Sequence, residues 1–423
     1  MRRTASVGGA GAAGPAAAPA PSPLLSYGFR PFFLAAALWA ALALALWMAM
    51  LALGVTLPSR LDPLEWHIHE MLFGFVPAAV AGFLLTALAN WTGQAPVSGA
   101  RLGLLLGLWI AARLAALLSA FLPVGVAIAI DMAFPAALVA TVAHELLAAR
   151  NRRNYLMIAP VTVLAVAQLL MDLGALDGID NLAGYGWRLG LAAIVILISV
   201  VGGRIVPSFT RTWLATRGTN RLPPAAGRLD QAALAALHAA LVAWVFFPSA
   251  RFTGVVLLAG AALNLWRLLQ WRGAATRSEP LLVVLHVGYA WLVAGGAALG
   301  VAILDPAFPL DAAIHSLTAG AIGTMILAVM TRVSRGHTGR ALCADGATVL
   351  IYVMVILAAA ARIAAALAPA VWEELLLGAA ALWIGAFGLF AVRYGPFLLR
   401  RRSAPGPAQG AIVQVPRSAP SPH

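Results

Sequence analysis

The chain has 423 residues, of which 62% are hydrophobic and 10% are charged, and it carries a formal net charge of +13. This composition excludes a soluble globular domain and is typical of a protein with many membrane-spanning helices. The basic residues are all arginine, and we interpret them as loop residues that orient the helices in the bilayer, not as a nucleic-acid-binding surface. The single cysteine, Cys343, excludes an internal disulfide, and no Cys-x-x-Cys-His motif for covalent haem attachment occurs.

Twelve apolar segments are long enough to cross a lipid bilayer, so the expected fold is all-α, a polytopic bundle of about 12 transmembrane helices. Arginine is concentrated in the even-numbered loops and the tails, whereas the odd-numbered loops are mostly acidic, which predicts that both termini are cytoplasmic. Residues 1–25 and 401–423 are rich in small residues and proline, and we expect disordered tails around a transmembrane domain at 26–400. The predicted spans are 31–53, 66–89, 101–119, 123–149, 155–175, 186–206, 229–247, 251–271, 280–303, 310–333, 347–367 and 372–395.

The start of the second span concentrates ionisable residues where a membrane tolerates them least. Asp62 is the predicted N-cap, followed by Pro63 at the first helical position and Glu65 at the capping-box position. His67 and His69 follow on the second turn. Residues two positions apart in a helix are separated by about 200° around its axis, so the two rings are predicted to face opposite sides. One metal ion cannot easily bind both imidazoles. Either the two histidines belong to different centres, or one is a ligand and the other orients it or packs beside it.

His67 and Glu70 are three residues apart, and this spacing places them on one helix face as a candidate ligand pair. Glu70 is also a candidate for moving protons near the site. His315, at the start of the tenth span, lies at about the same depth as His67 and His69, roughly 6–10 Å below the outer surface.

Three further histidines lie deeper in the predicted spans: His238 near the middle of the seventh, and His286 and His144 in the inner half. Each taken alone is as well explained by hydrogen-bonded packing as by ligation. Six histidines in the spans of one chain, however, favour cofactor binding, because imidazole is the commonest metal ligand and a usual axial haem ligand. We therefore treat His67, His69, His238, His286 and His315 as candidate metal ligands.

Small residues after His315 (Ala319, Gly320 and Gly323) are compatible with a flat macrocycle against the helix or with ordinary helix packing. Arg204 and Arg332, at inner helix ends, are candidates to pair with haem propionates, although such arginines are usually topology anchors.

These segments together resemble the NnrS family of bacterial membrane proteins, which is linked to nitric oxide stress and denitrification and described as containing haem and copper. The matching motifs include G-F-R-P-F-F-L at 28–34, W-H-I-H-E-M-L-F-G at 66–74, L-H-V-G-Y-A-W at 285–291, and the long segment H-S-L-T-A-G-A-I-G-T-M-I-L-A-V-M-T-R-V-S-R-G-H-T-G-R at 315–340. The resemblance implies a multi-pass protein of the bacterial inner membrane that carries non-covalent b-type haem and copper.

The leading functional hypothesis is a haem/copper membrane protein that binds or turns over nitric oxide at a His-ligated centre. Net reduction would make it an oxidoreductase and would need an electron donor, which the sequence does not identify. The alternative is a 12-helix secondary transporter in which intramembrane His and Glu residues relay protons. A visible spectrum distinguishes the two, because a transporter has no haem absorption.

Overall fold

The computed structural model describes residues 22–179 and 181–401, and every regular element in these residues is helical. Twelve helical segments are long and apolar enough to cross a membrane. Their bounds are Phe29–Leu53, Pro63–Thr92, Gly99–Leu117, Val124–Ala148, Arg152–Ala175, Leu182–Thr216, Arg228–Phe246, Arg251–Gln270, Pro280–Leu304, Leu310–His337, Gly346–Leu367 and Pro369–Leu399. The prediction of an all-α bundle with twelve spans is confirmed, with most boundaries within a few residues.

The largest boundary difference concerns the sixth span. Helix α7 (Leu182–Thr216) continues through Pro207, so the loop predicted at 207–228 starts only after Thr216. The sequence after Pro207 is polar and looks like a loop, but Thr210 and Leu214 are buried. Packing of these ten extra residues, nearly three turns, against neighbouring helices therefore overrides the local signal.

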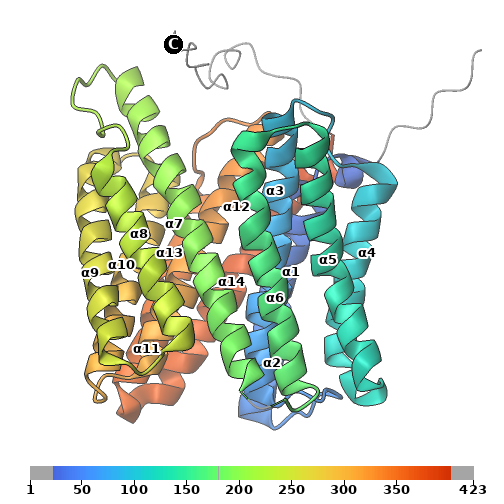
Figure 1. Cartoon of the computed structure of the whole chain (residues 1–423). Helices are drawn as coiled ribbons and strands as arrows, with labels where there is room; N and C mark the ends of the chain where they lie inside the picture. Colours follow the sequence, from blue (N-terminus) through green and yellow to red (C-terminus); the bar gives the residue numbers. More distant parts are fainter. Residues whose placement is uncertain (1–21, 180, 402–423) are drawn as a thin grey trace, which may run out of the picture.

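Both ends of the bundle can be followed in Figure 1. The start of α1 (Phe29–Leu53) and the end of α14 (Trp372–Leu399) lie at the same end of the molecule, while α2 (Pro63–His69) and α11 (Leu310–His315) lie at the opposite end. We call the end that carries α2 and α11 the outer end, and the other the inner end. This arrangement agrees with two termini on one side of a membrane, and which side that is stays a prediction from the arginines. The predicted tails at 1–25 and 401–423 fall mostly outside the described residues, although Pro23–Ser26 forms a short 3-10 helix (η1).

The bundle has two halves that meet along its middle (Figure 1). The first half contains α1, α3 (Val76–Thr92), α4 (Gly99–Leu117), α5 (Val124–Ala148) and α6 (Ile158–Ala175). The second half contains α7, α8 (Arg228–Phe246), α9 (Arg251–Gln270), α10 (Pro280–Leu304), α12 (Thr324–His337) and α13 (Gly346–Leu367). Helix α14 packs on both α1 and α13, and α6 packs on α7, so the first and last helices join the two halves.

The G-F-R-P-F-F-L segment forms the inner-end junction of α1 with the C-terminal helix. Phe29, Phe32 and Phe33 are fully buried. The guanidinium of Arg30, also buried, donates through Nη1 to the carbonyl oxygens of Leu398 at 2.8 Å and Arg400 at 2.6 Å. A charge-assisted bond to carbonyl groups left free at a helix end satisfies both partners.

Two π-helical segments interrupt the second and tenth spans. One (η2, Glu70–Phe75) follows His69 directly, and the other (η6, Ser316–Gly323) follows His315 directly. A π-helical turn is rare, and such turns occur frequently at functional sites because they change which side chains share a helix face. The two segments therefore lie next to His69 and His315, at the outer end of the bundle.

Candidate functional site

The helix that carries the two neighbouring histidines begins as predicted. Asp62 is the N-cap of α2, its Oδ1 accepts from the Glu65 backbone amide at 2.8 Å, and the Glu65 carboxylate accepts from the Asp62 amide at 3.3 Å. The capping box orients the first turns of the helix. His67 and His69 then point to opposite sides, which confirms the prediction from helix geometry. His69 faces α5 and α6, and His67 faces α1 on the other side of the helix.

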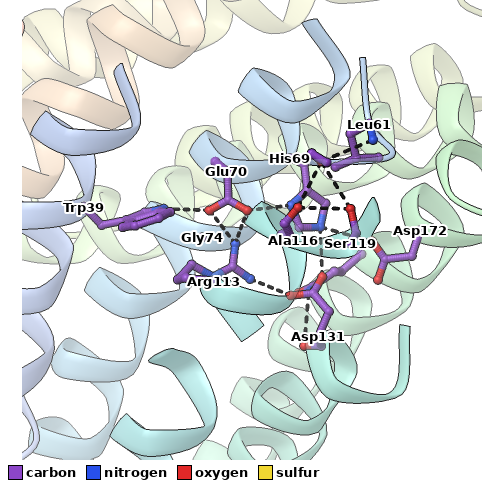
Figure 2. Close-up of polar contacts among 12 residues, drawn as sticks. Trp39, Leu61, His69, Glu70, Gly74, Arg113, Ala116, Ser119, Asp131 and Asp172 are labelled. Atoms are coloured by element: carbon purple, nitrogen blue, oxygen red, sulfur yellow. Dashed lines mark hydrogen bonds and ion pairs between the residues drawn. The ribbon is translucent and has the colours of Figure 1, made fainter. Parts of the chain in front are cut away.

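On the first side, His69 lies in a buried cluster of charged groups (Figure 2). Its Nδ1 is 3.0 Å from Oε1 of Glu70, and its Nε2 is 2.9 Å from Oδ2 of Asp131 and 3.1 Å from Oδ1 of Asp172. Asp131 comes from α5 and Asp172 from α6. All four side chains are at most 3% exposed. Three acidic groups therefore surround one imidazole at the outer end of the bundle.

Arg113 of α4 supplies the permanent positive charge of this cluster. Its Nη1 is 2.7 Å from both carboxylate oxygens of Glu70, and its Nη2 is 2.7 Å from Oδ1 of Asp131. The indole Nε1 of Trp39 donates to Oε2 of Glu70 at 2.7 Å. Gly74 faces the same atoms, since an added Cβ would lie 2.6–2.8 Å from Glu70, Arg113 and Trp39. We name the set His69, Glu70, Arg113, Asp131 and Asp172 the acidic cluster.

The predicted ligand pair of His67 and Glu70 is wrong. Glu70 is the first residue of the π-helical segment and contacts His69, Arg113 and Trp39. The i, i+3 spacing predicts that His67 and Glu70 share a helix face, but the groups that bind the Glu70 carboxylate come from the first half of the bundle. Glu70 is fully buried with both oxygens hydrogen-bonded, and its proposed part in proton transfer stays a prediction.

On the second side, His67 contacts α1. Its ring stacks on Trp47 with centroids 4.2 Å apart and an interplanar angle of 24°. Its Nδ1 is buried without a hydrogen-bond partner. His315 and Arg362 lie within electrostatic range of His67. We name the set His67, Asp311, His315 and Arg362 the histidine pair site.

His315 is oriented by an acid on its own helix. Its Nδ1 is 2.8 Å from the backbone oxygen of Asp311 and 2.9 Å from Oδ1 of the same residue. Arg362 donates through Nη2 to Asp311 Oδ2 at 2.5 Å, while its Nη1 is buried without a partner. A proton on Nδ1 held by Asp311 leaves the lone pair of Nε2 as the ligand atom, the arrangement usual for metal-binding histidines. Asp311 lies in the first turn of α11, whose N-cap is Pro309.

The deeper histidines lie apart from this layer. His238 of α8 contacts the hydroxyl of Ser199 through Nε2 at 2.7 Å. His286 of α10 is 3.0 Å from the backbone oxygen of Leu282 through Nδ1 and 3.4 Å from Thr210 Oγ1 through Nε2. His144 is exposed on the surface of α5. These contacts resemble hydrogen-bonded packing, and ligation by His238 or His286 stays a prediction.

The candidate propionate-binding arginines are at the inner half of the bundle. Arg204 is exposed on α7, and the guanidinium of Arg332 lies 4.1 Å from the centroid of the Phe209 ring. Arg332 is 17 residues beyond His315, roughly 25 Å along a helix. Neither arginine lies at the depth of His67 and His315, whose neighbouring arginine is Arg362.

The glycines after His315 face aromatic side chains. An added Cβ at Gly320 would lie 2.8 Å from the Trp291 indole, and one at Gly323 would lie 2.5 Å from the Trp383 indole. Trp291 Nε1 and Thr324 Oγ1 are buried without partners beside this segment. The small residues therefore accommodate flat rings, which here are indoles.

Asp131 and Asp172 are the site residues that the sequence reasoning missed. Asp172 is the only acid in the predicted span 155–175, whereas the span of Asp131 also contains Glu145 near its inner end. Both aspartates lie within apolar runs, A-I-D-M-A and L-M-D-L-G. The rule that ionisable residues at membrane depth mark a site applies to aspartate as it does to histidine. His69, Asp131 and Asp172 each offer one ligand atom, and these atoms lie within 4.8 Å of one another.

Comparison with known proteins agrees with the resemblance of the motifs. No curated protein matches the sequence. The profile of a protein family described as NnrS protein matches residues 23–402, which include every described span and both sides of the outer layer. The chain therefore belongs to the NnrS family.

Proposed function

We propose that the protein binds nitric oxide at a metal centre held by His67 and His315 in the outer layer of a bacterial inner-membrane protein. Membership of the NnrS family connects this multi-pass membrane protein with nitric oxide. The observation that carries the metal centre is the pair of unsatisfied atoms in the histidine pair site. His67 Nδ1 and Arg362 Nη1 are both buried and unpartnered, and buried polar atoms without partners are rare in folded proteins.

The residues of this site fit a haem. One of the two imidazoles would ligate the iron, and His315 is the one oriented through Asp311. The unpartnered Nη1 of Arg362 is a donor suited to a propionate, because arginine binds carboxylates well. The same imidazoles also suit copper. When bound, a haem or copper centre with an open coordination position supplies the site for a small diatomic ligand.

The protein's own residues position and shield this centre. Trp47 covers one face of the His67 ring, and α1, α11 and α13 surround the site. The Asp311–Arg362 ion pair, with an N–O distance of 2.5 Å, fixes the carboxylate that orients His315. Net reduction of nitric oxide would further need an electron donor and protons, and Glu70 across the helix remains the candidate proton carrier.

The test is a visible spectrum of the purified full-length protein, recorded before and after addition of nitric oxide. We expect a haem Soret band that shifts with nitric oxide. Replacing His67 or His315 by Ala should remove the haem or abolish the shift. Replacing the exposed His144 by Ala is the matched control and should leave both unchanged. A colourless wild-type preparation from haem-replete cells, with no copper on metal analysis, would refute the proposal and favour the transporter alternative.

A further inference from the structure

The acidic cluster is separate from the histidine pair site, and its negative charges exceed its positive charges. Three carboxylates, from Glu70, Asp131 and Asp172, face the single guanidinium of Arg113, and all are at most 3% exposed. With His69 neutral, two negative charges are therefore uncompensated. A proton on His69 cancels only one of them. Uncompensated charge in the interior of a membrane protein is costly, because neither water nor lipid solvates it.

The geometry around His69 indicates where the missing positive charge belongs. Its Nε2 faces Asp131 Oδ2 at 2.9 Å and Asp172 Oδ1 at 3.1 Å. One nitrogen carries at most one proton, so both oxygens compete for it. Metal-to-ligand distances of about 2.0–2.2 Å place neighbouring ligand atoms roughly 2.8–3.6 Å apart, from octahedral to tetrahedral geometry, a range that includes both separations. The second oxygen of Asp172 is buried without any partner and is available as a further donor.

The surroundings of His69 are those of a ligand. Its Nδ1 is 3.0 Å from Glu70, which is in turn held by Arg113 and Trp39. A histidine that ligates through one nitrogen typically donates its other N–H to a carboxylate, which sets the tautomer and the ring orientation. Glu70 thus orients His69, and is not itself a ligand.

We infer that His69, Asp131 and Asp172 bind a divalent transition-metal cation, distinct from the nitric oxide centre. The two charges of the ion balance the two excess charges of the cluster. The donor set of one imidazole and two carboxylates favours zinc, iron(II) or manganese. It lacks the sulfur that copper(I) prefers and the all-oxygen shell of calcium or magnesium. The site joins α2, α5 and α6, so the ion would hold the first half of the bundle together at its outer end.

The test is metal analysis of the purified full-length protein by mass spectrometry, with haem iron counted separately by the pyridine haemochrome assay. We expect close to one non-haem zinc, iron or manganese ion per chain in wild type, and X-ray absorption with only nitrogen and oxygen ligands. Asp131→Asn and Asp172→Asn, which keep side-chain shape and remove charge, should lower the occupancy at least tenfold. If both variants fail to accumulate, the wild-type stoichiometry and ligand shell still decide the matter.

Two controls separate this inference from other effects. Asp230→Asn breaks another largely buried ion pair, 2.6 Å to Arg267, in the second half of the bundle, and should keep the ion. His67→Ala should change the Soret band and keep the ion, whereas Asp172→Asn should lose the ion and keep the Soret band. The proposals for the two sites can therefore be refuted independently. A wild-type protein without non-haem metal after incubation with zinc or manganese would overturn the inference, and would show that protons balance the cluster. Full metal content in both Asn variants would overturn it as well.

Discussion

Arg113 is the residue whose removal should disturb the first half of the bundle most. It makes three contacts of 2.7 Å to Glu70 and Asp131, and all three side chains are at most 3% exposed. Arg113→Met keeps the volume and removes the charge. Breaking a buried ion pair by deleting one partner costs about 3–5 kcal/mol, because the other charge stays buried without compensation. We expect a loss of this size in the free energy of unfolding. The second replacement Glu70→Gln should recover at least about 1 kcal/mol, since contacting residues couple.

The measurement is denaturant unfolding of the protein in detergent micelles, followed by tryptophan fluorescence and circular dichroism. Arg101→Met on the same helix is the matched control. Its ion pair with Glu145 has the same kind of geometry, 2.8 Å, but the arginine side chain is 59% exposed, so the loss should be within about 1 kcal/mol. An Arg113→Met protein as stable as the Arg101→Met protein, or strict additivity with Glu70→Gln, would show that the cluster is not held by charge pairing.

Three further outcomes are expected. Gly74→Ala should destabilise the protein in the same unfolding assay, because its Cβ would lie 2.6–2.8 Å from side-chain atoms of Glu70, Arg113 and Trp39. Gly107→Ala, with open space around it, should be neutral or stabilising by up to about 1 kcal/mol. Equal effects of the two replacements would show that a side chain at position 74 does not clash with these residues. At the inner end, burial favours the neutral form of Asp345, but hydrogen bonds from Thr348 and the contact with Arg393 outweigh it and hold the pKa of that carboxyl well below its ordinary value. Its stabilising contribution should therefore be complete above about pH 4 and decline as the pH falls further, and Asp345→Asn should remove that part of the pH dependence of unfolding; an unchanged acid limb would contradict this. Reporter fusions at Gly178 and Pro224, which lie in connections at opposite ends of the bundle (Figure 1), should report opposite sides of the membrane, Gly178 periplasmic and Pro224 cytoplasmic, and the same side for both would refute the topology.

Most of the fold could be predicted because its signals are local. Apolar runs of membrane length define the spans, and the Asp62–Glu65 capping box marks a helix start within four residues. The divergence of His67 and His69 follows from the rotation of about 100° per residue. Each of these inferences needs only neighbouring residues, and each is confirmed.

The partners of the site residues could not be predicted in the same way. Glu70 meets Arg113 of α4, and His69 meets Asp131 and Asp172 of α5 and α6, more than 40 residues away in the chain. The i, i+3 spacing paired Glu70 with His67, but Arg113 and Trp39, which come from other spans, bind the Glu70 carboxylate instead. The isolated aspartates were visible in the sequence, and their cost in a membrane was the available signal.

The position of α2 explains why one short segment contains residues of two sites. The helix lies between the two halves at the outer end, so His69 faces α5 and α6, while His67 faces α1 and the helices of His315 and Arg362. Only Ile68 separates the two histidines, and a replacement at either one can shift the other ring through the shared backbone. Residues that belong to one side alone avoid this coupling. Variants of His315 on α11 and of Asp172 on α6 are therefore the decisive pair, because each removes a group from one site and leaves α2 unaltered.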